Sequence, residues 1–289
     1  MTRGAALLTL IASLSVAAPA AQSPARPPDV ADTIARVGAR LVEWYARAQS
    51  IVSTEDVWIT PLRFDMSSAG FARRLGYELR VAWEPGDTRP GAFPEPSVLR
   101  QILTVNGRPP RPGDEPGCMD PKPVTPEPLE MFLPGEREAF TFKHAGTGRV
   151  DGRPALMIDY KGVALGKPEI TWKEDCVSVS LPGRAIGRVW IDPVTHDVLR
   201  LDEHLVGLFE FNVPREQQRR GGASSLVIER ADSSIRYRSV EFQDPAETLM
   251  LPAQVDTTTV VRGGGIQRTR ISQRFTGYRR FISDVRMLP

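Results

Sequence analysis

Residues Gly187 to His204 read GRVWIDPVTHDVLRLDEH, and their alternation decides how the rest of the chain is interpreted. Val189 and Ile191 point to one face of a strand and their neighbours to the other, because successive side chains of a strand alternate. Asp192, followed by Pro, opens a turn by accepting backbone N–H groups. His196 is expected in the left-handed conformation, which it tolerates better than most residues. The stretch predicts a β-hairpin whose aspartates serve the turn and the strand ends and form no catalytic centre.

A long helix is predicted upstream of this hairpin, over residues 29–50. Apolar residues recur there at helical spacing from Ile34 through Leu41 to Tyr45, with arginines on the opposite stripe. Asp29 takes the N-cap, where its side chain accepts backbone N–H groups of the first turn. This is the one long helix that the sequence predicts.

Everything after the helix has the pattern of β-strands. Runs of β-branched and aromatic residues are interrupted by the turn signals Asn106-Gly107 and Asp151-Gly152. Strands do not alternate with helices, which argues against a parallel βαβ architecture. The predicted fold class is therefore mainly β, with eight to eleven antiparallel strands after one N-terminal helix.

The first residues predict export. Arg3 precedes an apolar run from Ala5 to Val16 and then small residues, the pattern of a secretory signal peptide over residues 1–21. The run is shorter than the about 20 residues that span a bilayer, so no stable membrane span is expected; a membrane anchor is the alternative. Residues 22–28 form a Pro-rich linker and residues 29–289 a single domain. The predicted location is the periplasm or another exported compartment.

Two cysteines, Cys118 and Cys176, are the whole complement of the chain. In an oxidising compartment such a pair predicts a disulfide bond, worth about 4 kcal/mol through the loop that it closes; two free buried thiols are the alternative. Cys118 lies in a Pro-rich insertion, residues 109–128, with eight prolines. Pro cannot donate to a strand ladder, so a stiff irregular connection is expected, either a lid or a decoration.

Charge and motifs exclude several function classes. Lysine and arginine number 37 and aspartate and glutamate 35, a net charge of +2 that gives no reason to expect a nucleic-acid partner. The three histidines lack metal-ligand spacing, and no nucleophile-elbow, zinc-protease or phosphate-loop motif occurs. We therefore expect no enzyme activity, no metal and no cofactor. The arginine-rich loop Pro214–Gly222 is interpreted either as solvated or as a contact with anionic lipid headgroups.

The hairpin and the long helix, with the later segments LMLPAQVDTTTV (Leu249–Val260) and YRRF (Tyr278–Phe281), resemble a known superfamily. It is the bacterial outer-membrane lipoprotein carrier superfamily, with LolA/LolB-like, RseB-like and uncharacterised exported members. His196 stands where their hairpin usually has Gly. The resemblance implies an open half-barrel, that is, a strongly curved antiparallel sheet with the helix packed on its concave side. It also implies an acyl chain, from a lipid or a lipoprotein, as the ligand of that side.

A cavity on the concave face also follows from sheet physics. A sheet of this many strands curls, and one helix is too little to fill its apolar hollow. Large alternating side chains are the expected lining, with Trp190 assignable to either face. They are Trp58, Tyr77, Leu79, Trp83, Ile102, Phe142, Ile158 and Trp190. The predicted function is non-catalytic binding of a lipid or acyl chain; the alternative is an envelope protein-interaction or sensor module whose sheet docks a partner protein.

Overall fold

The computed structural model describes residues 29–47, 50–83, 96–114, 127–173, 176–218, 222–263 and 266–280. Within these ranges one α-helix, α1 (Val30–Arg47), precedes thirteen strands and three short 3-10 helices. The predicted signal peptide and linker lie outside the described residues. The described chain is mainly β, as the alternation of its side chains predicts.

The strands range from four residues to nineteen. They are β1 (Ser50–Pro61), β2 (Arg73–Trp83), β3 (Pro96–Val105), β4 (Phe140–Val150), β5 (Arg153–Gly162), β6 (Glu169–Lys173), β7 (Cys176–Ser180), β8 (Ala185–Ile191), β9 (Val198–Leu205), β10 (Phe209–Asn212), β11 (Ser225–Gln243), β12 (Ala246–Arg262) and β13 (Ile266–Arg280). The 3-10 helices are η2 (Glu127–Phe132), η3 (Arg137–Ala139) and η4 (Arg215–Gln217).

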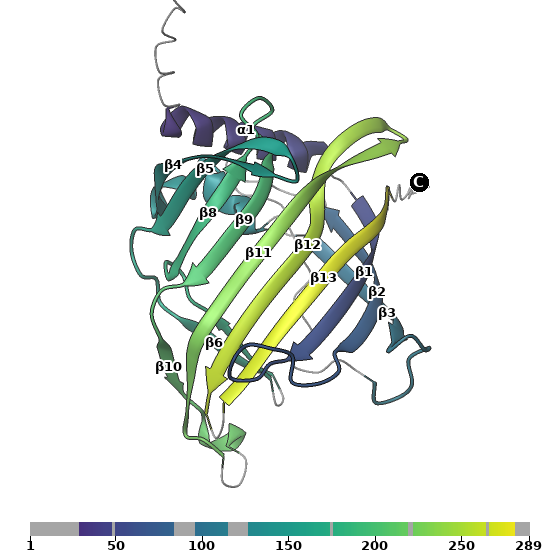
Figure 1. The fold of residues 1–289 in the computed structure, drawn as a ribbon, viewed down its shortest axis with the longest axis vertical. Helices are drawn as coiled ribbons and strands as arrows, with labels where there is room; N and C mark the ends of the chain where they lie inside the picture. The colour runs from purple at the N-terminus through teal and green to yellow at the C-terminus, as the bar shows by residue number, and fades with distance from the viewer. Residues whose placement is uncertain are drawn as a thin grey trace, which may run out of the picture.

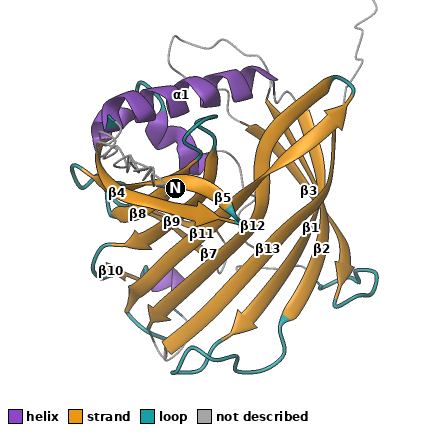
Figure 2. Ribbon diagram, turned by 45° about the horizontal axis from the view of Figure 1, so that its top comes forward, coloured by secondary structure: helices purple, strands orange, loops and turns teal. Residues whose placement is uncertain are grey.

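Eleven of these strands form one antiparallel sheet, in the order β3-β2-β1-β13-β12-β11-β9-β8-β5-β4, with β10 paired to β11 (Figure 1). Its edges, β3 and β4, do not pair with each other, so the sheet is not closed into a barrel. Figure 2 shows it as a curved trough, with α1 crossing one end. The predicted open, curved antiparallel sheet with a helix on its concave side is confirmed.

The structure has more strands than the eight to eleven that the sequence pattern predicts. β6 and β7 form a separate two-stranded hairpin of five residues per strand, and β10 has four residues. Segments this short contain too few alternations to be recognised as strands in a sequence.

The predicted hairpin is β8 and β9. Asp192 Oδ1 accepts the backbone N–H groups of Val194 at 2.9 Å and Thr195 at 3.1 Å, which closes the turn. His196 has a φ of 60°, in the left-handed region, and its N–H donates to the Asp192 carbonyl. Both details of the predicted turn are confirmed.

α1 begins as predicted and covers the concave face. Asp29 Oδ1 accepts a backbone N–H group of the first turn at 2.9 Å. The apolar stripe from Ile34 to Leu41 is buried in the main core. The stripe was predicted to reach Tyr45, whose side chain lies outside the description; the buried indole of Trp44 is the last described member.

The segment after the Pro-rich insertion packs beneath α1. A Cβ at Gly38 would lie 2.4 Å from the carbonyl oxygen of Phe132, so α1 can approach η2 this closely only with glycine there. Arg137 Nε donates to the same carbonyl at 3.1 Å. Phe132 and Leu133 are fully buried in the core. Residues 115–126 of the insertion lie outside the described chain.

One row of side chains across the sheet shows how the core forms. Its members face one another in register from β5 to β12, and every one is buried. All are β-branched or leucine, which pack well on a pleated surface. They are Ile158, Val189, Leu201, Ile235 and Val255.

We expect Leu41→Ala to lower the free energy of unfolding by about 2–5 kcal/mol, because it removes a buried side chain between α1 and the sheet. Arg36→Ala should change it by about 0.5 kcal/mol or less, since the ion pair of Arg36 with Asp32 is exposed. Urea unfolding followed by circular dichroism is the measurement. Equal losses in the two variants would mean that α1 does not pack on the sheet.

Candidate functional site

An apolar cavity of about 70 Å³ lies between α1 and the concave face of the sheet. Val37, Leu41 and Trp44 line it from α1. The walls that the sheet supplies are mostly apolar or aromatic. They include Ile51, Leu79, Val81, Tyr237, Leu251, Phe275 and Tyr278.

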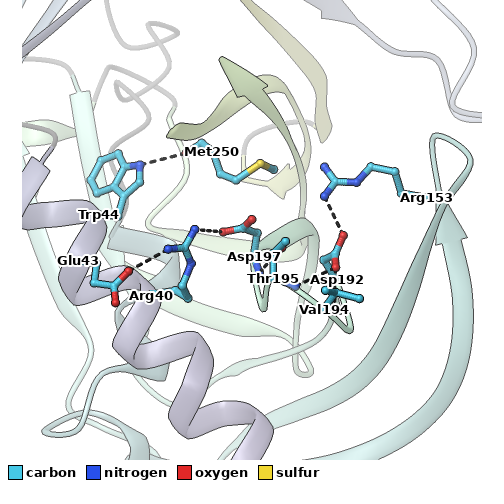
Figure 3. Close-up of polar contacts among 9 residues, drawn as sticks. All are labelled: Arg40, Glu43, Trp44, Arg153, Asp192, Val194, Thr195, Asp197 and Met250. Atoms are coloured by element: carbon cyan, nitrogen blue, oxygen red, sulfur yellow. Dashed lines mark hydrogen bonds and ion pairs between the residues drawn. The ribbon is translucent and has the colours of Figure 1, made fainter. Parts of the chain in front are cut away.

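Arg40 lies at the rim of this cavity, where α1 meets the turn between β8 and β9 (Figure 3). Its Nη2 is 3.3 Å from Asp197 Oδ1, and its Nη1 donates to Glu43 at 2.8 Å. Burial alone would lower the pKa of Arg40, but Asp197 and Glu43 outweigh that effect and raise it. Trp44 Nε1 donates to the Met250 carbonyl at 3.1 Å. These contacts fasten α1 to the turn and to β12.

The turn is itself anchored to β5. Arg153 Nη2 donates to Asp192 Oδ2 at 2.7 Å (Figure 3). Burial would raise the pKa of Asp192, but the backbone N–H groups of Thr195 and Val194, together with Arg153, hold it below its ordinary value. The aspartates of the β8–β9 hairpin therefore position the rim contact of α1.

A buried polar cluster lies beside the cavity. Arg100 donates to both carboxylate oxygens of Glu55, at 2.8 and 2.9 Å, and Gln273 Nε2 donates to Glu55 at 2.8 Å. Glu55 pairs with Phe275 across the β1–β13 ladder, and Arg100 pairs with Leu79 across the β2–β3 ladder. Both Phe275 and Leu79 line the cavity. The Glu55 side chain is 0% exposed and that of Arg100 9%.

This cluster divides the concave face in two. On its far side a second apolar cluster contains Val57, Ile59, Leu75, Tyr77 and Val105. The Arg100 guanidinium carbon lies 3.9 Å from the ring centroid of Tyr77, so the arginine separates the two apolar regions. The cavity beneath α1 thus ends at a charged pair on this side.

Five of the eight predicted lining residues are on the concave face. Leu79 lines the cavity. Tyr77 belongs to the second apolar cluster, and Ile102 packs against it. Ile158 is buried in the main core and Phe142 packs against that core, but neither lines the cavity. The structure therefore gathers these residues on one face without bringing them to one site.

Trp58 and Trp190 require a correction, because they lie on the convex face. Trp58 alternates with buried Val57 and stands between two guanidinium groups, 5.3 Å from that of Arg74. Trp190 lies under Arg200, with 4.7 Å between the guanidinium carbon and the ring centroid. Alternation and size had favoured a cavity wall for Trp58 and had left Trp190 assignable to either face, but tryptophan also stacks with cations. The side chain of Trp83 falls outside the described part.

Sequence reasoning missed most of the real lining. Trp44 was recognised only as a helix position, and Tyr237, Phe275 and Tyr278 come from the last strands, which supplied none of the predicted residues. Their signal is alternation, with buried Ile235 followed by Tyr237 at the strand period. Alternation marks a shared face, but it does not say that this face meets α1.

No group of three His, Cys, Asp or Glu side chains among the described residues could hold a metal ion.

Tyr160 donates to Glu203 at 3.0 Å, and burial raises the pKa of Glu203 even though this hydrogen bond opposes the shift. Gly187 leaves room for the Tyr160 ring, because a Cβ there would lie 2.5 Å from its hydroxyl. No helix of the described chain is long and apolar enough to cross a bilayer.

The described residues include one of the two cysteines of the predicted disulfide. Cys176 begins β7 and is half-buried, whereas Cys118 lies outside the described residues. The pairing therefore stays a prediction.

We expect Arg100→Met to lower the free energy of unfolding by about 3–5 kcal/mol, because Glu55 would keep its charge in a buried site without this partner. The double variant Glu55→Gln/Arg100→Met should recover most of the loss, since no buried charge remains. A double-mutant cycle of urea unfolding measures the coupling. Strictly additive losses would mean that the two side chains do not act as a pair.

Comparison with known proteins finds similarity to solved structures alone. No family model matches the chain, and no curated protein matches its sequence. A DUF1329 family protein from Desulfovibrio piger is similar in structure, with a TM-score of 0.41 and 8% identity over 90% of this chain and 96% of that one.

Two further solved structures belong to the expected superfamily by their descriptions. A putative outer membrane lipoprotein-sorting protein domain from Vibrio parahaemolyticus has a TM-score of 0.37 and 9% identity, over 88% of this chain and 95% of that one. A LolA superfamily protein from Nitrosomonas europaea has a TM-score of 0.32 and 10% identity, over 91% and 99%. The superfamily that the hairpin and helix resemble is thus among the structural neighbours of this chain.

Proposed function

We propose that this protein is an exported, non-catalytic carrier that holds the acyl chain of a lipid or lipoprotein between α1 and the concave face of its sheet. The observation that carries the proposal is the cavity itself, an apolar space lined by aliphatic and aromatic side chains with a polar rim. Small-molecule sites have this composition. The signal-peptide pattern of residues 1–21 supports a periplasmic location, and residues 29–289 act as one domain in this proposal.

The size of the cavity requires α1 to move. Typical ligand sites measure about 300–1,000 Å³, whereas this cavity is about 70 Å³. With α1 in the position described, which we call the closed form, the cavity has room for only the end of an acyl chain. An acyl chain replaces the apolar stripe of α1 on the sheet, and each buried methylene then contributes about 0.8 kcal/mol.

In this proposal α1 acts as a gate, and two polar contacts at the rim hold it closed. Arg40 holds the outer face of the helix to Asp197, and Trp44 holds its C-terminal turn to the Met250 carbonyl. The Arg40–Asp197 pair is partly exposed, with 39% and 16% of the side chains accessible, so it contributes about 1 kcal/mol or less. Such a fastening can open without unfolding the sheet.

The alternative is a protein-interaction or sensor module at the cell envelope. One observation favours it: α1 and η2 already fill most of the concave side, since their side chains are buried with those of the sheet in one core. In that case the closed form is the active one, and a partner protein docks on the outside of the sheet. Binding of an acyl chain separates the two functions.

A fluorescent fatty acid should bind the wild-type protein saturably. Leu79→Glu should abolish that binding, because it places a charge in the cavity wall. Leu99→Glu is the matched control on the neighbouring strand, since Leu99 is 59% exposed. Val81→Phe is a second test that adds no charge: its ring fills the cavity and should weaken binding while the protein stays folded. Absence of saturable binding by the wild type would favour the docking module instead.

Asp197→Asn should speed the entry of the fatty acid by about fivefold, because it removes a contact worth about 1 kcal/mol that closes the rim. Asp32→Asn breaks an exposed ion pair two turns earlier on the same helix, where Asp32 does not line the cavity, and should leave the rate unchanged. Stopped-flow fluorescence measures both rates. If the two variants behave alike, the contact between Arg40 and Asp197 does not gate the cavity.

A further inference from the structure

The loop between β1 and β2, residues 62–72, exposes two aromatic side chains. Phe64 is 85% and Phe71 101% exposed, the two largest values among the exposed apolar side chains of the described chain. The loop lies at the end of the sheet opposite α1 (Figure 1). On β1 the cavity residue nearest the loop is Ser53, nine residues before Leu62, so roughly 30 Å separate the loop from the cavity at about 3.3 Å per residue.

This loop has a fixed conformation. Asp65 Oδ1 accepts the backbone N–H of Ser67 at 3.0 Å and its hydroxyl at 2.6 Å. The Arg63 N–H donates to the Ser67 carbonyl, and the Leu62 N–H donates to Arg268 on β13. These bonds hold the loop in a position that keeps its phenylalanines in solvent, although apolar side chains of this size contribute most when buried.

Arginine side chains lie on or beside this loop, one of them against the Phe64 ring. The Arg268 guanidinium lies 5.2 Å from the ring centroid of Phe64, and Arg63 belongs to the loop itself. Arg270 follows on the same strand as Arg268. Among the described residues, no carboxylate forms an ion pair with any of these three arginines. Aspartate occurs once in the loop, at Asp65.

The short helix η4 lies at the same end of the sheet. η4 begins at Arg215, an exposed residue, within the arginine-rich segment Pro214–Gly222 of the sequence. η4 precedes β11, and the start of β11 pairs with the end of β12. The start of β13 pairs with the same end of β12 and, further along, with the end of β1 that leads into the β1–β2 loop. Figure 1 shows η4 and the β1–β2 loop together at the end remote from α1.

We propose that this end of the sheet docks on a membrane surface with anionic headgroups. Phe64 and Phe71 enter the interface between headgroups and acyl chains, and Arg63, Arg268 and Arg270 contact the phosphates. Exposed aromatic side chains beside arginines that form no ion pair within the described residues match such a surface in both polarity and charge. The contact is independent of the cavity and leaves the gate of α1 in solution.

Co-sedimentation of the mature protein with vesicles tests this contact. Vesicles of phosphatidylcholine with phosphatidylglycerol should bind the protein, and vesicles of phosphatidylcholine alone should bind it at least tenfold more weakly. Phe64→Ser and Phe71→Ser should each lower the partition coefficient by about tenfold. Val194→Ser is the matched control, because Val194 is 81% exposed but lies in the turn beside α1. It should bind like the wild type.

Insertion is measured separately with Phe71→Trp. Its tryptophan emission should shift to the blue when anionic vesicles are added, and that of Val194→Trp should not. Arg63→Gln and Arg268→Gln should reduce binding to anionic vesicles, whereas Arg36→Gln on α1 should not. The proposal is overturned if the wild type does not bind anionic vesicles, or if the phenylalanine variants and Val194→Ser bind equally. The substituted side chains are exposed except that of Arg268, which is half-buried, so melting curves of all variants are compared with the wild type to exclude unfolding as the cause.

Discussion

The apolar concave face of the sheet must be covered, and the rest of the structure depends on how α1 covers it. A curved sheet open at both edges exposes a hollow that water would otherwise fill. The helix places Ile34, Val37 and Leu41 in that hollow, and η2 adds Phe132 from below. Burial of such side chains contributes about 1.5–3 kcal/mol each, far more than the exposed ion pairs of the same helix. The position of α1 is therefore set by apolar contact, and its polar contacts at the rim adjust it.

Charge inside the hollow has a different role. The Glu55–Arg100 pair is buried, and removal of two ions from water costs about as much as their attraction returns. Two apolar side chains would stabilise this position at least as well. What the pair adds is a boundary: the apolar space under α1 ends there, and the cluster around Leu75 begins. For the proposed acyl-chain ligand, this boundary would limit the length that can lie below α1.

The sequence predicted the helix and the strands better than it predicted which face of the sheet each side chain lies on. The β8–β9 turn follows from Asp192 and the residues after it, whose local hydrogen bonds need no tertiary contact. The helix follows from its own period. Trp58 was wrongly assigned and Trp190 could not be decided, because alternation gives two faces without naming the concave one. The Trp58 ring stacks with arginines, and the Trp190 ring lies under Arg200 and packs against a separate apolar cluster. Tyr237 was missed because alternation places it on the same face as buried Ile235 but does not say that this face meets α1.

In the two proposals the ends of the molecule have separate roles: one end docks on a membrane and the other holds the acyl chain. Docking through Phe64 and Phe71 would leave α1 roughly 30 Å from the lipid surface, so the bilayer could not open the gate by direct contact. Opening must be driven by the ligand. Each methylene placed on the sheet contributes about 0.8 kcal/mol, whereas the contact between Arg40 and Asp197 resists by about 1 kcal/mol. A few methylenes offset that contact, and the remaining chain length has to replace the apolar stripe of α1. Long acyl chains should therefore open the gate, and short ones should not.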